Sequence, residues 1–230
     1  MTHLHYFPLS AGLAALFVGV LVALLILLQI GVLRRVYSTL GLPPAVVVLL
    51  LGASLIGSYV NLPLARLPEQ RVVAREVVEV MGVPFLTPVA VDWPGTVLAI
   101  NVGGAVIPIL LSAYLLFRYR LFWPALFSVA IVAFFVHQMA NPIPGVGIAV
   151  PTVAPPLLAA FAALVLSRRF AAPLAYIGGS IGVLIGADIL NLGSLQTLGA
   201  PVASIGGAGT FDGVFLTGVI ALVLASLVTP

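Results

Sequence analysis

The sequence predicts an all-α protein, a polytopic membrane helix bundle of about seven transmembrane helices that forms one domain over residues 1–230. Hydrophobic residues make up 62% of the chain and charged residues only 7%, whereas about a quarter of a soluble domain is charged. The chain also divides into apolar stretches of about 20 residues, the length of helix that crosses a bilayer. We therefore expect a multi-pass protein of the cell membrane, with the lipid bilayer as a partner.

Prolines, arginines and apolar runs set the boundaries of the predicted spans. In chain order the spans are Leu9 to Leu33, Pro43 to about Leu64, Gly95 to Phe117, Leu121 to Ala140, Val153 to Ser167, Ala172 to Leu192 and about Ile205 to Val228. The first span exceeds the apolar core of a signal peptide, so we expect it to be retained. Pro43 and Pro44 suit a first helical turn, where the missing N–H costs no hydrogen bond.

The arginines predict the orientation. With the N-terminus outside, six lie on the inner side: Arg34, Arg35, Arg118, Arg120, Arg168 and Arg169. The outer side then holds three, with four acidic residues: Arg66, Arg71, Arg75, Glu69, Glu76, Glu79 and Asp92. Cytoplasmic loops carry an excess of basic residues, so the N-terminus is predicted outside and the C-terminus inside. Because the arginines lie near span ends rather than in one cluster, we expect no nucleic acid partner.

The one long connection, residues 65–94, is predicted to form an outer loop. Its pieces VVEV and FLTPVAV are separated by a turn-forming stretch, Met81 to Pro84. This pattern indicates either a short β-hairpin or an interfacial amphipathic segment. We expect a surface flap, and a lid over an outward-facing site is the alternative.

Two pairs of similar segments indicate an internal repeat. LIGSYVNL at 55–62 is similar to LIGADILNL at 184–192, and NVGGAV at 101–106 is similar to SIGGAG at 204–209. The pairs predict two parallel three-helix repeats, residues 9–117 and 153–228, with a linker helix at 121–140. This layout is similar to that of the sugar-permeating SWEET class, although layout alone does not establish function.

Polar side chains from five spans are predicted to lie in one layer near the outer surface. They are Asn61, Asn101, His137, Asp188 and Asp212. Asn61 lies 18 residues beyond Pro43, Asp188 lies 19 residues beyond Arg169, and the others are similarly placed. At a rise of about 1.5 Å per residue, all five lie about 25 to 28 Å above the inner boundary of a hydrocarbon layer about 30 Å thick.

The members of this layer differ in what they indicate. Asn61 and Asn101 are typical of helix-end or interhelical hydrogen bonding. His137 suits a headgroup-facing position as well as it suits a ligand or proton carrier. Asp188 and Asp212 indicate a functional site, because a carboxylate within a span costs about 3 kcal/mol even on insertion scales.

Glycine spacing completes the predicted site. Gly178, Gly182 and Gly186 are four residues apart and predict a ridge against which another helix packs, whereas Asp188 and Asn191 are predicted to face the opposite side. A second glycine group weakens regular helix and predicts a broken or re-entrant start to the last span. It consists of Gly206, Gly207, Gly209 and Gly213. Residues 141–151 predict an extracellular loop, or a segment that dips toward the same cavity.

Several motifs resemble those of a prokaryotic family of membrane proteins catalogued as domain of unknown function 1614. They are GADILNL, GAPVASIGGAGTFDG, NVGGAVIP and PGVGIAVP. The resemblance covers nearly the whole chain and implies a multispanning membrane protein without an assigned activity. A weaker likeness connects the two aspartates to presenilin-type intramembrane aspartic proteases. Asp188 follows Ala187 rather than a tyrosine, and Asp212 lies in Thr-Phe-Asp-Gly rather than Gly-x-Gly-Asp.

Three functions fit these residues, and the sequence leaves open whether the protein is an enzyme. The first is a proton- or cation-coupled transporter or permease of a small solute or ion; its cofactor is left open, with a bound cation as the candidate. Its predicted binding residues are Asn61, Asn101, His137, Asp188, Asn191 and Asp212. The second is an intramembrane protease-like hydrolase of a membrane-embedded substrate, with Asp188 and Asp212 catalytic. The third is a metal-dependent hydrolase with His137, Asp188 and Asp212 as candidate ligands.

Overall fold

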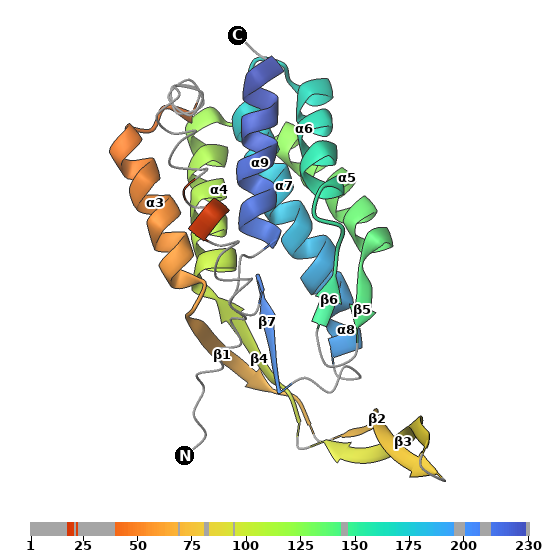
Figure 1. The fold of residues 1–230 in the computed structure, drawn as a ribbon. Coiled ribbons are helices and arrows are strands. Elements are labelled where there is room, and N and C mark those ends of the chain that lie inside the picture. Colours follow the sequence, from red (N-terminus) through yellow and green to blue (C-terminus); the bar gives the residue numbers. More distant parts are fainter. Residues whose placement is uncertain are drawn as a thin grey trace.

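The computed structural model describes residues 18–20, 22, 40–68, 70–80, 83–93, 95–143, 147–195, 201–207 and 213–228. This part of the chain is mostly helical and forms a bundle with a small β-sheet at one end (Figure 1). Most of the predicted first span lies outside the described residues, as do Gly209 and Asp212.

The helices follow several of the predicted spans. In chain order they are α3 Pro44–Gly57, α4 Ile107–Tyr119, α5 Phe122–Met139, α6 Ala154–Leu166, α7 Ala171–Val183, α8 Leu192–Leu195 and α9 Gly213–Val228. Two π-helical turns, η1 Val102–Val106 and η2 Leu184–Asp188, precede α4 and extend α7, and a 3₁₀ turn, η3 Ile189–Asn191, follows η2. Helices α5 and α6 match the predicted fourth and fifth spans to within one residue at each end.

Three helical segments among the described residues are long and apolar enough to cross a membrane: Val102–Tyr119, Phe122–Met139 and Ala171–Ser194. The apolar helices α6 and α9 are shorter. Length and composition thus indicate a membrane protein. The count of seven spans and the orientation remain predictions.

A three-stranded sheet departs from the all-α prediction. Its strands are β1 Asn61–Arg66, β4 Val97–Asn101 and β7 Val202–Ile205, in the order β1-β4-β7. Strand β4 is antiparallel to β1 and parallel to β7. The second span was therefore predicted too long, since α3 ends at Gly57. The third span begins with strand β4, and the seventh begins at the last residue of β7. Apolar strands and helices have similar hydropathy, and the pairing partners lie far apart in the sequence.

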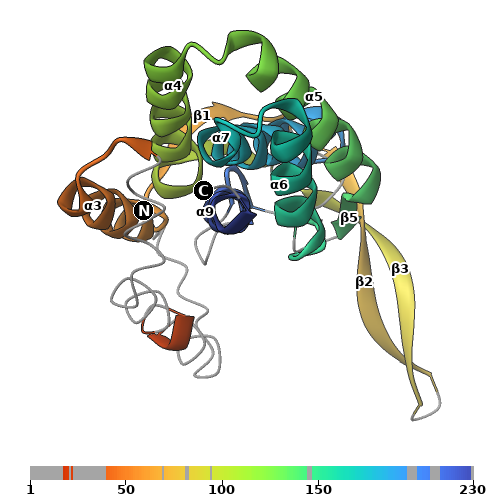
Figure 2. The ribbon, with the colours of Figure 1, turned by 90° about the horizontal axis from the view of Figure 1, so that it is seen from above.

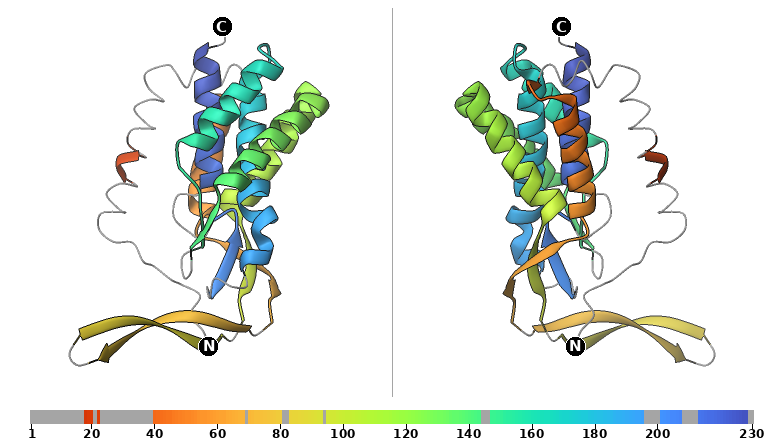
Figure 3. Two further views of the ribbon diagram at one scale, coloured as in Figure 1. Left: turned by 90° about the vertical axis from the view of Figure 1, so that its right-hand side faces the viewer. Right: turned by 90° about the vertical axis from the view of Figure 1, so that its left-hand side faces the viewer.

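The predicted outer loop contains a β-hairpin, one of the two alternatives. Strand β2, Gln70–Val80, pairs antiparallel with β3, Val83–Trp93, in a regular register from Gln70↔Trp93 to Val80↔Val83. This hairpin extends away from the helix bundle (Figures 2 and 3). A shorter hairpin joins β5 Asn141–Ile143 to β6 Gly147–Ala149, within the loop predicted at residues 141–151.

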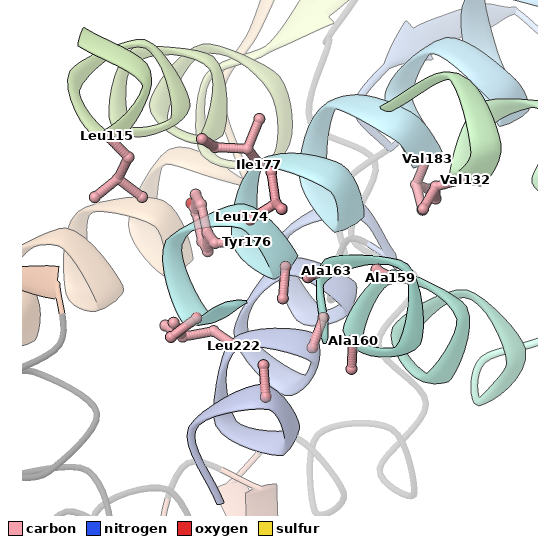
Figure 4. Packing of buried hydrophobic residues seen from close by; sticks show 14 of the residues in the cluster. Leu115, Val132, Ala159, Ala160, Ala163, Leu174, Tyr176, Ile177, Val183 and Leu222 are labelled. Atoms are coloured by element: carbon pink, nitrogen blue, oxygen red, sulfur yellow. The ribbon is translucent and has the colours of Figure 1, made fainter. Parts of the chain in front are cut away.

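Helix α7 forms the centre of the bundle. Buried side chains of α4, α5, α6 and α9 pack around it, among them Leu115, Val132, Ala159 and Leu222 (Figure 4). In an apolar 18-residue stretch of the α7 segment, 72% of the stretch is buried inside the protein. The corresponding shares are 33% and 28% in the segments of α4 and α5. The outer helices instead expose large apolar side chains, which suits contact with lipid: examples are Leu110, Phe127, Phe134 and Phe161.

The predicted glycine ridge packs α7 against α5. A Cβ atom at Gly182 would lie 2.7 Å from the Cβ and Cγ1 atoms of Val132. A Cβ atom at Gly186 would lie 2.5 Å from the carbonyl oxygen of Ala133, and Gly178 is equally close to Ser128. Since real Cβ atoms do not approach other atoms so closely, the two helices pack at this separation only with glycine at these positions.

Candidate functional site

Asn101 connects the end of α3 to the start of η1. Its side chain is completely buried, and its Oδ1 atom accepts a 2.8 Å hydrogen bond from the N–H of Gly104, which caps the π-helical turn. Its Nδ2 atom donates to the carbonyl oxygen of Ser58 at 2.7 Å and to Oδ1 of Asn61 at 3.0 Å. Both ends of this amide are thus satisfied, as a buried polar group requires.

Asn61 extends this network to the third strand of the sheet. It pairs with Asn101 in the β1–β4 register, and its Oδ1 atom also accepts a 2.6 Å hydrogen bond from the hydroxyl of Ser204 on β7. The structure therefore brings Asn61 and Asn101 together, and their hydrogen bonds hold three chain segments at the sheet end of the bundle. Sequence reasoning missed Ser58 and Ser204, since a serine in an apolar segment carries no spacing signal.

Asp188 lies where helix α7 loses its regular form. It is the last residue of η2, it is partly buried, and its Oδ2 atom accepts a 2.7 Å hydrogen bond from the N–H of Gly206. Gly206 follows β7 and, like Gly207, has a positive φ, at 85° and 94°. Helix α9 begins at Gly213. Residues 208–212 lie outside the described residues, so the broken or re-entrant start of the last span stays a prediction.

Gly206 also contacts the other π-helical turn. A Cβ atom at this position would lie 2.7 Å from the N and Cβ atoms of Ala105, within η1. The backbone at Gly206 therefore lies between the two π-helical turns. It packs closely against Ala105 of η1, and it donates a hydrogen bond to Asp188 of η2. π-Helical turns are rare and occur frequently at functional sites, so their meeting at one residue marks the candidate site.

His137 and Asn191 form a separate pair. The Nδ2 atom of Asn191 lies 3.2 Å from Nδ1 of His137 and donates to the carbonyl oxygens of Gly186 and Ala187 at 2.9 and 3.0 Å. His137 belongs to α5, so Asn191 faces the same helix as the glycine ridge. The prediction that Asn191 faces the opposite side is wrong. It assumed a regular α-helix, whereas the π-helical and 3₁₀ turns have different numbers of residues per turn and so rotate Asn191 toward α5.

The predicted polar layer is only partly assembled. No hydrogen bond in the described part of the chain joins the His137–Asn191 pair to Asp188 or to the asparagines of the sheet. Within the same residues, no group of three histidine, aspartate or glutamate side chains could hold a metal ion. The predicted metal trio and the predicted aspartate pair both include Asp212, which lies outside the described residues.

One pair of similar segments, 101–106 and 204–209, adjoins two strands that pair with each other. Strands β4 and β7 are parallel, with Ala99 opposite Ser204 and Ile100 opposite Ile205. Sequence similarity instead aligns Asn101 with Ser204, so the spatial register differs from it by two residues. The repeat remains a prediction.

Comparison with known proteins places the chain in a family. The model of a family described as "Protein of unknown function (DUF1614)" matches residues 55–224. This range contains the β1-β4-β7 sheet, both π-helical turns and the residues from Asn61 to Asp188 discussed above. Searches of curated proteins and of solved structures found no match. Because the family model covers well over half of the chain, the protein belongs to the DUF1614 family.

Proposed function

We propose that the protein is a proton- or cation-coupled transporter of a small solute or ion in the cell membrane, and that Asp188 binds the coupling cation. The observation that carries the proposal is the position of Asp188. It ends a π-helical turn within a segment long enough to cross a membrane, and its carboxylate accepts a hydrogen bond from Gly206, the positive-φ glycine that follows β7.

The charge of Asp188 requires a positive partner. Among the described residues its hydrogen-bond partner is the neutral N–H of Gly206, and no basic side chain forms an ion pair with it. A carboxylate in a membrane span is costly unless it is paired. A proton that converts the carboxylate to the neutral acid, or a small cation bound beside it, neutralises this charge. Both are exchangeable, because protonation of a carboxylate and cation binding are reversible.

The surrounding backbone suits cation binding. Strand β4 leads into η1 and α4, and its parallel neighbour β7 leads through two positive-φ glycines toward α9. Irregular backbone at membrane depth occurs where it is buried in protein or lines a cavity. In secondary transporters, carbonyl groups of such interrupted helices coordinate the coupling ion. Asp188 contacts the positive-φ glycine that follows β7, which supports an ion site there.

Ion flux through the purified protein in liposomes tests the proposal. Proton, Na⁺ and K⁺ fluxes are measured with fluorescent indicators for the wild type, Asp188→Asn and Asp92→Asn. Asp92 lies on strand β3 of the hairpin and serves as the matched control. We expect Asp188→Asn to abolish the flux and Asp92→Asn to retain it. Equal fluxes in the wild type and Asp188→Asn would refute the role of Asp188.

The hydrolase and metal-centre hypotheses both need the carboxylate of Asp212. No observation on the described residues favours either of them over transport, so neither is proposed.

A further inference from the structure

We infer that the turns α4–α5 and α6–α7 together form a binding site for the phosphate headgroup of an anionic phospholipid. Four arginines lie on or beside these turns: Arg118 in the last turn of α4, then Arg120, Arg168 and Arg169. Both turns lie at the end of the bundle opposite to the β1-β4-β7 sheet (Figure 1). The site is therefore distinct from Asp188 and from the proposed transport function.

Two aromatic side chains hold the turns together. The rings of Tyr119 and Phe170 are in contact, with centroids 5.6 Å apart. Both rings are partly buried against the hydrophobic core. They form an aromatic contact that joins the end of α4 to the start of α7, and each ring is next in sequence to at least one of the arginines.

These two rings position two of the guanidinium groups. The Cζ atom of Arg118 lies 5.7 Å from the centroid of the Tyr119 ring, and that of Arg169 lies 5.2 Å from the Phe170 ring. Both distances are within the range of a cation–π interaction. A guanidinium group that stacks on an aromatic ring still has its N–H groups free to donate hydrogen bonds in its own plane. These donors form a fork whose geometry matches the oxygens of a phosphate.

In the described part of the chain, no acidic side chain pairs with these arginines. All four are exposed. The sequence contains no aspartate or glutamate between Asp92 on the hairpin and Asp188 at the sheet end. Their positive charge is thus uncompensated by the protein on these two turns, and an anion from outside the chain complements it.

The surrounding side chains identify the anion as part of a lipid. Phe117, Phe122 and Trp123, on and beside the α4–α5 turn, are 67%, 48% and 71% exposed. Exposed aromatic rings of this kind are typical of the level of the lipid headgroups. A phosphate with attached acyl chains contacts the arginines and these apolar rings at once, whereas a free phosphate contacts only the arginines.

Native mass spectrometry of the full chain in a non-ionic detergent tests the inference. The probes are phosphatidylglycerol and phosphatidylcholine with identical acyl chains. We expect the wild type to bind phosphatidylglycerol preferentially, and the double variant Arg118→Gln/Arg169→Gln to bind it about 25-fold more weakly, at roughly fivefold per arginine. Arg66→Gln changes an exposed arginine on β1 at the sheet end and is expected to bind as the wild type does.

Three outcomes would overturn the inference: equal binding of the two lipids by the wild type, unchanged binding by the double variant, or an equal loss in Arg66→Gln. Inorganic phosphate and glycerol phosphate are added as competitors, and displacement of the lipid by either at micromolar concentration would assign the site to a soluble phosphate. If the double variant does not fold, the salt dependence of wild-type binding decides. High salt is expected to weaken phosphatidylglycerol binding, and unchanged binding would contradict an electrostatic site.

Discussion

The carboxylate of Asp188 accepts a 2.7 Å hydrogen bond from the backbone N–H of Gly206, so the end of a π-helical turn is linked to the positive-φ glycine that follows strand β7. The contact spans 18 residues of sequence and joins the two segments that carry most of the predicted site. Asp188 therefore has two roles to distinguish: it accepts the hydrogen bond from Gly206, and its negative charge is proposed to bind a cation.

The two roles of Asp188 are separable by mutation. Asp188→Asn keeps a side-chain oxygen that accepts from Gly206, so its free energy of unfolding is expected to stay close to that of the wild type. Asp188→Leu leaves the buried N–H of Gly206 without its acceptor and is expected to cost about 1–3 kcal/mol. Denaturant titration in mixed micelles measures both. Equal stability of the leucine and asparagine variants would show that the hydrogen bond contributes little.

Gly206 is expected to tolerate no side chain. Gly206→Ala places a Cβ atom 2.7 Å from Ala105 and forces alanine to a φ of 85°. The backbone and overlap costs together predict a loss of about 2–5 kcal/mol in unfolding free energy. Gly193→Ala is the control, because a Cβ atom there meets nothing within 4 Å. If both variants unfold at the same denaturant concentration, the close packing of Gly206 on η1 is wrong.

Asn101 is expected to be the asparagine that matters most for stability. Asn101→Ala removes the cap of η1 and leaves the Gly104 N–H and the Ser58 carbonyl without their partner, which predicts a loss of about 2–4 kcal/mol. Asn141→Ala, which removes one exposed hydrogen bond to Met139, is expected to change the unfolding free energy by less than about 0.5 kcal/mol. Thermal unfolding followed by circular dichroism compares the two, and a similar shift in both would contradict the network.

The contact between Gly182 and Val132 predicts a compensating pair. Gly182→Ala overlaps the Val132 side chain and is expected to destabilise the protein by about 1–3 kcal/mol. Val132→Ala removes the overlapping Cγ1 atom and keeps the Cβ atom, so in the double variant the cost of Gly182→Ala is expected to fall in part. A double-mutant cycle with a coupling energy of about 1 kcal/mol or more would support the α5–α7 packing, and strict additivity would contradict it.

The predicted orientation is open to a labelling test, because the chain contains no cysteine. A cysteine introduced at Arg66 is expected to react with a membrane-impermeant maleimide in intact cells. A cysteine introduced at Arg120 is expected to react only after the membrane is permeabilised. The positive-inside rule predicts this difference. The reverse pattern would invert the topology, and labelling of both positions from outside would contradict a membrane-spanning α4.

Features that depend on residues close together in the sequence were predictable from it. Apolar runs bounded on one side by arginines predicted α5 and α6, and the four-residue glycine spacing predicted the ridge of α7 that packs against α5. The glycines at 206 and 207 predicted an irregular backbone before the last helix, which their positive φ values show. Each of these signals depends on the properties of neighbouring residues, and such properties are present in the sequence itself.

The sequence by itself determined the apolar composition, the positions of the charged and polar side chains along the chain, and membership of the DUF1614 family. The tertiary structure alone decided that residues 61–66, 97–101 and 202–205 form a sheet, that Asn191 faces α5, and that Asp188 reaches Gly206. The reason is that strand pairing and the π-helical shift depend on backbone partners far apart in the sequence, whereas hydropathy reports only how readily each residue leaves water.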